Sequence, residues 1–203
     1  MQGRFYADAR DEIKWSLVSR LARDGGIHRV IQVAMVPQST RREPKLVQEH
    51  VRRFFQSERE ELQPLWNGCL RRAERLGQVP PNRYEIKVLD QPFAVRDRET
   101  YFREICELLE TYPEAVLVLL DPDTGMEPPK HTTAAHVTKT EIGRVFNSMP
   151  SGSVLVVYQH HTHRPGFVGT AQSKFEDALP EDAVKDRPVR DGDVAFLVAH
   201  KRA

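Results

Sequence analysis

Two carboxylates follow an apolar run in the middle of the chain, at the position where a strand would end. The run Val116–Leu120 contains only Val and Leu, and Asp121 and Asp123 come directly after it. An apolar run between turn residues predicts a strand that is buried on both faces of a parallel sheet. Ligands of open α/β sheets bind at the carboxyl ends of the strands. We therefore predict that Asp121 and Asp123 are catalytic and hold a substrate amine or a cation. The alternative is a turn in which Asp121 only bonds to nearby backbone donors.

A second apolar run, residues 154–157, passes into polar and aromatic side chains. Both runs follow helical segments, so both strands should point in the same direction and end at the same edge of the sheet. Imidazole titrates close to neutral pH, which suits proton transfer. We predict that His160 is a general acid or base, and that Tyr158 and Gln159 contact the substrate.

The histidines beyond this strand raise the question of a metal. In an extended chain His161 and His163 point to the same side. Together with Asp121 and Asp123 they would provide the mixed nitrogen and oxygen ligands that suit Zn, Mn or Fe. Their spacing matches no CxxC or HExxH framework. A divalent metal therefore stays an alternative to a polar strand end whose histidines bond to carbonyls or face solvent.

A third group of candidate residues lies near the N-terminus. On a helix, Lys14 and Trp15 lie on the same face as Asp11. A lysine beside an apolar Trp is costly to bury unless it reaches a carboxylate or a ligand. We predict that Lys14 is catalytic and pairs with Asp121 or with a phosphate, and that Trp15 contacts the substrate. The alternative is an acidic first turn followed by a core Trp.

The rest of the sequence supplies the elements that would position these residues. Helical periodicity alternates with short apolar runs, which predicts a doubly wound sheet with helices on both faces. The predicted strands are 29–36, 83–90, 116–120, 153–158 and 193–200. The predicted helices are 8–23, 97–112, 138–149 and 172–179, with a helical insertion rich in Arg and Glu at about 44–77. We therefore predict one three-layer α/β domain over residues 1–203, with a mostly parallel sheet.

Local signals refine the ends of these elements. Residues 83–90 alternate between polar and apolar side chains, which predicts a strand near an edge of the sheet. Asp97 is predicted to cap the helix that follows it. Thr138 and Glu141 have the spacing of a capping box, which predicts the start of the next helix.

Composition excludes several classes of protein. The formal net charge is +1 and 29% of the residues are charged, so no global charge favours a polyanionic partner. No apolar run approaches the length of a membrane span, and the first residues lack a signal-peptide apolar region. Cys69 and Cys106 are far apart in helical patterns, which indicates buried thiols rather than metal ligands. We predict a cytoplasmic protein without a membrane partner, and these features leave the oligomeric state open.

Blocks of residues distributed over nearly the whole chain carry a resemblance. They are Phe5-Tyr6-x-Asp8…Asp11-x-x-Lys14-Trp15, Leu119-Leu120-Asp121-Pro-Asp-Thr-Gly125, Tyr158-Gln159-His160 and Asp193-Val-Ala-Phe196. In these blocks the chain resembles an uncharacterised family of bacterial and phage proteins. More distantly it resembles the Rossmann-like adenine-N6 methyltransferases of ribosomal RNA. Those enzymes also open with an Asp-x-x-Lys helix and carry Asp-Pro-Pro-Tyr after a buried strand.

The second resemblance implies a methyltransferase-like fold, S-adenosylmethionine as cofactor, and a nucleic acid or nucleotide as partner. It implies that Asp121 holds the target amine and that Asp11 and Asp90 bind the cofactor, Asp90 through the ribose. The chain departs from the pattern where residues 123–124 replace a Pro and an aromatic residue. It departs again at residues 33–40, which contain no glycine. A Cβ at each position of that turn hinders close approach of the backbone to a cofactor, so we predict weak or absent binding of S-adenosylmethionine.

Three hypotheses about function follow. The first is a methyltransferase-like enzyme that acts on nucleic acid or a nucleotide at the edge where the two polar strand ends meet. The second is a metal-dependent hydrolase or nuclease, in which the acid pair and one of the later histidines hold an ion that activates water. The third is a non-catalytic binding component of a defence or regulatory complex.

Overall fold

The computed structural model describes residues 9–37, 85–89, 91–128, 131–161 and 166–203. The predicted helical insertion at 44–77 lies outside the described residues, as do Asp90, His163 and Cys69. The side chain of Asp11 also lies outside them, although its backbone is part of a helix. The assignment of residues 1–203 to one domain with an insertion therefore stays a prediction.

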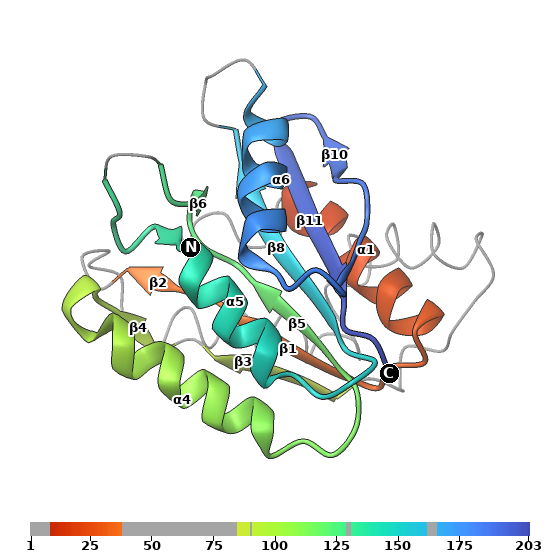
Figure 1. Cartoon of the computed structure of the whole chain (residues 1–203). Coiled ribbons are helices and arrows are strands. Elements are labelled where there is room, and N and C mark those ends of the chain that lie inside the picture. Colours follow the sequence, from red (N-terminus) through yellow and green to blue (C-terminus); the bar gives the residue numbers. More distant parts are fainter. Residues whose placement is uncertain (1–8, 38–84, 90, 129–130, 162–165) are drawn as a thin grey trace, which may run out of the picture.

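In the described ranges, the apolar runs form the central strands of one seven-stranded sheet (Figure 1). Its order is β10 (Val189–Asp191), β11 (Val194–His200), β8 (Val154–His160), β5 (Val116–Leu120), β1 (Arg29–Val33) and β3 (Glu85–Leu89), with β9 (Val184–Lys185) paired to β11. The strands β3, β1, β5 and β8 are parallel. In contrast, β11 runs antiparallel to β8, β9 and β10. The prediction of a mostly parallel sheet is therefore confirmed, and β3 lies at an edge as its alternating sequence predicts.

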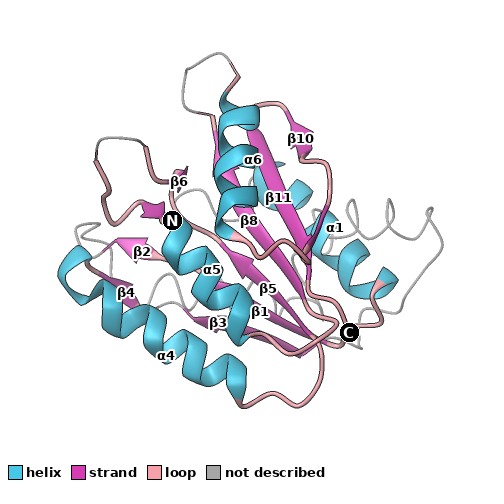
Figure 2. Cartoon of the chain, viewed as in Figure 1, coloured by secondary structure: helices cyan, strands magenta, loops and turns pink. Residues whose placement is uncertain are grey.

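Helices cover both faces of this sheet, which makes three layers (Figure 2). Helix α1 (Ala9–Asp24) covers one face, where Trp15 and Val18 belong to the same hydrophobic cluster as Leu119 of β5. Helices α4 (Arg98–Glu110), α5 (Lys139–Ser148) and α6 (Phe167–Ala178) cover the other face, with Phe102, Phe146 and Phe175 in its core. We call these two sides the α1 face and the α4–α6 face. This arrangement confirms the predicted three-layer α/β fold class.

Two short parallel pairs extend the chain beyond the carboxyl ends of the main strands. Strand β2 (Val36–Pro37) follows β1 and pairs with β4 (Pro92–Phe93), which follows β3. Strand β6 (Gly125–Met126) follows β5 and pairs with β7 (His136–Val137). A 3-10 turn, η3 (Val95–Asp97), leads into α4. These additions build up the carboxyl edge of the sheet, where the predicted site lies.

The order of the strands places a topological switch between β1 and β5. In the strand order, β3 follows β1 toward one edge of the sheet, and β8 follows β5 toward the opposite edge. Ligands of doubly wound sheets bind in the crevice at such a switch point. The backbone N–H of Asp121 donates to the carbonyl of Val33 at 3.0 Å, which fixes Asp121 beside the end of β1.

Several element ends differ from their predictions. Asp97 precedes α4 but makes no capping hydrogen bond, because its φ of −101° and ψ of 7° lie outside the extended region that caps use. Helix α6 begins at Phe167 rather than at residue 172, because Phe167, Ala171 and Phe175 already form one buried helical face. The capping box of Thr138 and Glu141 is confirmed. None of the helices in the described ranges is both long and apolar enough to cross a membrane.

Candidate functional site

Lys14, Gln32 and Asp121 form a buried polar cluster at the carboxyl end of β5. Lys14 Nζ donates a hydrogen bond to Asp121 Oδ2 at 2.9 Å, and Gln32 Nε2 donates to the same oxygen at 2.7 Å. The side chains of Lys14 and Asp121 are only 3% and 2% exposed. The predicted pairing of Lys14 with Asp121 is therefore confirmed.

The alternation of side chains along the strands explains why these three residues meet. In β5, Leu117 and Leu119 face α1, so Asp121 faces α1 as well. In β1, Val30 faces α1 and Gln32 follows it on the same side. Gln32 is not among the residues that the sequence pattern predicts. The sequence feature that could have identified it is a single amide in the otherwise apolar run of residues 30–33. This run is buried in the sheet.

Two acceptor oxygens of this cluster receive no hydrogen bond from the described part of the chain. Gln32 Oε1 is buried and has no partner. Both hydrogen bonds to the Asp121 side chain reach Oδ2, which leaves Oδ1 unused. The amide of Gln32 cannot simply be turned round, because its Nε2 must face the carboxylate. A buried acceptor without a donor costs about 1–3 kcal/mol, so the cluster favours a ligand that donates hydrogen bonds.

Tyr158 joins the cluster from β8. Lys14 Nζ lies 5.2 Å from the centre of the Tyr158 ring, within the range of a cation–π contact. The ring of His160 lies next along the strand, with its centre 6.5 Å from that of Tyr158. Trp15 is 2% exposed and belongs to the core of the α1 face, which supports its structural interpretation. Lys14, Asp121 and Tyr158 thus come together as predicted, with His160 beside them.

His160 is held by nearby residues of the polypeptide, Asp193 and His161, rather than by the cluster. Its Nε2 lies 3.5 Å from a carboxylate oxygen of Asp193, and its Nδ1 lies 3.2 Å from the carbonyl of His161. Parallel pairing of β5 with β8 confirms that both strands end at the same edge. His160 is therefore positioned at the predicted edge, with Asp193 as its carboxylate partner.

Gln159 holds the loop after β5 in place, and its predicted contact with substrate stays a prediction. It is 2% exposed, and its Oε1 accepts from Met126 N at 2.9 Å. Its Nε2 donates to the carbonyls of Thr124 and His160 at 3.1 and 2.7 Å, which uses both N–H groups. The amide lies against Gly125, whose φ is +114° and whose position leaves no room for a Cβ. A glycine is therefore needed at position 125, because the amide of Gln159, which fixes the loop after β5, fills the space of a Cβ.

The predicted metal set does not assemble among the described residues. Asp121 is occupied by Lys14 and Gln32, whereas the ring of His161 packs edge-on against Phe167 at 4.8 Å. No group of three His, Cys, Asp or Glu side chains in the described ranges is placed to hold a metal ion. The charge of Asp123 acts on His136, whose pKa it raises against the larger lowering effects of burial and Arg98.

The turn after β1 does not have the shape of a glycine cradle for a cofactor. Met35 occupies it with a φ of +35°, the one positive φ outside glycine in the described residues. Its side chain is fully buried in the core of the α4–α6 face, as is that of Val33. A Cβ at a position with positive φ is strained and restricts how closely another molecule can approach the backbone. The described residues of this turn therefore do not fit the S-adenosylmethionine site that the resemblance implies.

A second buried ion pair lies across the sheet and organises the loop after β5. Arg98 of α4 forms a bidentate ion pair with Glu141 of α5: Nε donates to Oε1, and Nη2 donates to Oε2. The same guanidinium donates to the carbonyls of Thr133 and His136 at 3.1 and 2.6 Å. The capping-box sequence reveals Glu141, whereas nothing in the sequence reveals its pairing with Arg98. This pair fixes residues 133–136 against two helices.

No protein-family model and no curated protein matches this chain. Among solved structures, a DUF574 family protein from Streptomyces avermitilis is 14% identical, with 95% of this chain and 83% of that chain covered and a TM-score of 0.40. The S-adenosylmethionine-dependent methyltransferase SibL in its apo form is 11% identical, with 93% and 56% covered and a TM-score of 0.36. Likeness at this level carries no argument about function.

Proposed function

We propose that this chain is a methyltransferase-like α/β enzyme that binds a nucleotide or nucleic acid through a primary amino group of the base. The observation that carries the proposal is the pair of unused acceptors, Asp121 Oδ1 and Gln32 Oε1, in one buried cluster. The cluster lies at the carboxyl end of β5, beside the topological switch of the sheet.

The number of acceptors suits a group with two N–H bonds. A primary amino group on an aromatic base has two such bonds, so one can reach the carboxylate of Asp121 and the other the carbonyl of Gln32. Both side chains are held by their mutual hydrogen bond, at 2.7 Å. A rigid pair of acceptors rejects an analogue without the amino group, because the acceptors then stay unpaired.

Electrostatics favours a neutral amine over a cation. The charge of Asp121 is already compensated by Lys14, whose Nζ lies 2.9 Å away in a nearly inaccessible position. Because the pair is neutral as a whole, it offers little attraction to a metal ion or an ammonium group. The two hydrogen bonds to Asp121 Oδ2 leave its Oδ1 to accept from a neutral N–H donor.

S-adenosylmethionine would supply a methyl group in an enzyme of this class. Since Met35 occupies the turn after β1, we expect weak or absent binding of this cofactor to the isolated chain. Isothermal titration calorimetry with S-adenosylmethionine checks this expectation. A tight, saturable heat signal would contradict it.

Four nucleosides test the proposed recognition. Adenosine and cytidine carry a primary amino group on the base, whereas uridine and purine riboside do not. We expect saturable binding of the first two and at least tenfold weaker binding of the others, measured by NMR titration of the full chain. Equal binding of all four, or binding of none, would overturn the proposal.

Asp121→Asn is the informative variant. An asparagine must turn its oxygen toward Lys14 and Gln32, so its NH2 group replaces the unused acceptor with a donor. We expect adenosine and cytidine to lose at least tenfold in affinity. Asp191→Asn is the matched control, because Asp191 is exposed on β10, and it should bind like the parent. Unchanged affinity in Asp121→Asn would contradict the assigned role.

A further inference from the structure

The cluster of Lys14, Gln32 and Asp121 is held in one arrangement. Gln32 Nε2 and Lys14 Nζ both donate to Asp121 Oδ2, at 2.7 and 2.9 Å. The three residues are 0%, 3% and 1% exposed in the order Gln32, Lys14 and Asp121, and close-packed neighbours restrict their rotamers. If the amide of Gln32 turned over, its oxygen would face the carboxylate in place of its N–H. The directions of Gln32 Oε1 and Asp121 Oδ1 are therefore fixed.

The observation that points to a ligand is the oxygen of Gln32. This side chain is fully buried, yet its Oε1 has no hydrogen-bond partner in the described part of the chain. A buried acceptor without a donor destabilises the protein that contains it. A bound N–H group would supply the donor that the described residues lack.

One amino group can reach both unused acceptors. The two terminal atoms of a planar amide or carboxylate lie about 2.2 Å apart, and the hydrogen bond that joins the two groups is 2.7 Å long. Gln32 Oε1 and Asp121 Oδ1 are therefore at most about 7 Å apart by covalent geometry. The two N–H bonds of a primary amine reach acceptors that are roughly 5 Å apart. The span of an amine thus fits within the limit that this hydrogen bond sets.

We propose that Gln32 and Asp121 together distinguish an unmodified amino group from its N-methyl form, so that the site takes the first and rejects the second. This inference rests on the proposed function and adds the modification state of the substrate. Methylation replaces one N–H bond by an N–CH3 bond, which cannot donate to a buried oxygen. One acceptor then stays unpaired. In a reaction sequence, the chain acts on the base before any alkylation of that nitrogen.

A series of cytidine derivatives tests the proposal on the parent chain. The amino group of cytidine has two N–H bonds, that of N4-methylcytidine has one, and that of N4,N4-dimethylcytidine has none. We expect affinity, measured by NMR titration of the full chain, to fall at least tenfold with the first methyl group and further with the second. 5-Methylcytidine is the size-matched control, because its methyl group leaves both N–H bonds in place. It should bind within about threefold of cytidine.

Gln32→Met tests the residue itself. Methionine is close to glutamine in size but has no strong acceptor, so the variant removes Oε1 and offers a methyl group an apolar neighbour. We expect the preference for cytidine over N4-methylcytidine to fall to about threefold or less. If Gln32 had only a structural role, both affinities would change alike and their ratio would stay at the value of the parent. That result would overturn the proposal.

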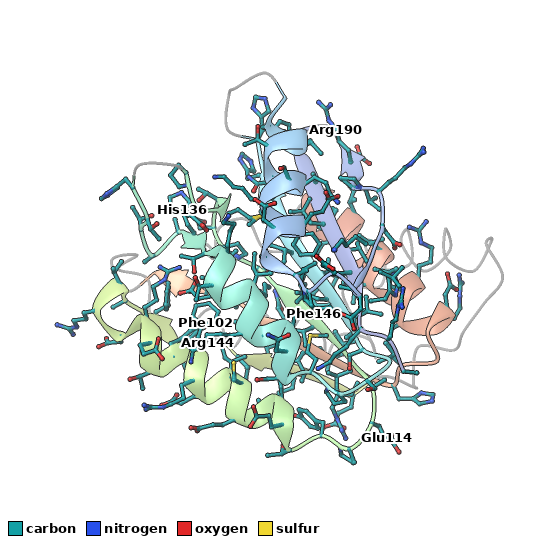
Figure 3. All side chains as sticks on the ribbon, viewed as in Figure 1. Phe102, Glu114, His136, Arg144, Phe146 and Arg190 are labelled. Carbon is teal, nitrogen blue, oxygen red and sulfur yellow. The ribbon has the colours of Figure 1, made fainter. Side chains whose placement is uncertain are left out.

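Gln172→Met is the matched control. Gln172 also has a buried oxygen without a partner, and its Nε2 donates to Glu176 at 2.6 Å. It lies on α6, which packs beside α5 and its labelled Phe146 in Figure 3, on the face opposite α1. The preference for cytidine should stay at the parent value in this variant. A change as large as that in Gln32→Met would overturn the proposal, because loss of any buried amide would then have the same effect.

The measurements also distinguish failure of this inference from failure of the proposed function. If cytidine binds no more tightly than uridine, the proposed function fails and this inference fails with it. If cytidine is preferred but N4-methylcytidine binds equally well, one acceptor is enough and this inference fails alone. Equal losses with N4-methylcytidine and 5-methylcytidine also overturn it, because size then sets the selectivity. Circular dichroism checks that both variants fold, and the series on the parent chain decides the matter if Gln32→Met does not.

Discussion

Two ion pairs in the described part of the chain, Lys14–Asp121 and the largely buried Arg98–Glu141, lie on opposite faces of the same sheet edge and differ in how their carboxylate oxygens are used. In the pair on the α4–α6 face, Glu141 Oε1 accepts from Arg98, and Oε2 accepts from Arg98 at 2.7 Å and from Thr138 N at 2.8 Å. Both oxygens therefore have donors. In the pair on the α1 face, Lys14 and Gln32 both bond to Oδ2 of Asp121, and Oδ1 receives nothing from the described residues.

This difference separates a structural pair from a candidate binding pair. A buried charge is stabilised only when its hydrogen-bonding capacity is satisfied as well. Glu141 meets that condition within the protein, where it caps α5 and anchors the loop before it. Asp121 meets it only in part, and the neighbouring Gln32 has an unpartnered oxygen too. Unsatisfied acceptors at a ligand crevice indicate function more directly than burial of charge does.

The largest expected effect comes from removing one partner of the pair on the α1 face. Lys14→Met leaves Asp121 as a buried, uncompensated charge, and we expect a loss of about 3–5 kcal/mol in the free energy of unfolding. Urea denaturation followed by circular dichroism measures it. The double variant Lys14→Met with Asp121→Leu should recover most of that stability, yet bind no adenosine. Recovery of binding in the double variant would contradict the site.

Removing Arg98 should cost somewhat less, because its side chain is 15% exposed while that of Glu141 is 7% exposed. We expect Arg98→Met to lower the free energy of unfolding by about 2–3 kcal/mol, near the lower limit for a broken buried pair. Adenosine affinity should stay close to that of the parent. A loss of adenosine affinity as large as that of Asp121→Asn would mean that the two pairs serve one function.

Gly125→Ala tests the contact between the loop after β5 and the end of β8. The positive φ and the amide of Gln159 both oppose a Cβ at this position. We expect a loss of about 1–3 kcal/mol in stability, typical of a strained backbone. Gln159→Ala in the same chain should relieve the steric part. A thermal melt of the two variants compares them, and an unchanged melting temperature for Gly125→Ala would refute the contact.

The smallest effect is a pH dependence from His136. Because its pKa in the folded state lies below the ordinary value of 6.5, the unfolded chain binds the proton more readily. The stabilisation is therefore complete above pH 6.5 and is lost as the pH falls through the lower, folded-state pKa. Urea midpoints between pH 7.5 and about 5 should decline less in His136→Gln than in the parent. Parallel curves would remove His136 as the cause.

The sequence by itself determined the layers and the edge at which the polar residues gather. Apolar runs such as Val116–Leu120 are long enough to need burial on both faces, so they predict a covered, mostly parallel sheet. The same runs predict that Asp121 and Tyr158 end neighbouring strands. Lys14 could be linked to Asp121 because a lysine in an apolar helix face must find a carboxylate.

Only the tertiary structure decided what each polar residue does at that edge. Pairing across strands and helices is not local, so no spacing in the sequence distinguishes Gln32, which joins the cluster, from Gln159, which closes a loop. Asp121 joins the cluster of Lys14 and Gln32, whereas the charge of Asp123 acts on His136. His136 is held by a local bond from Thr133 N to its Nδ1 and by a distant one, from Arg98 38 residues earlier in the chain to its carbonyl.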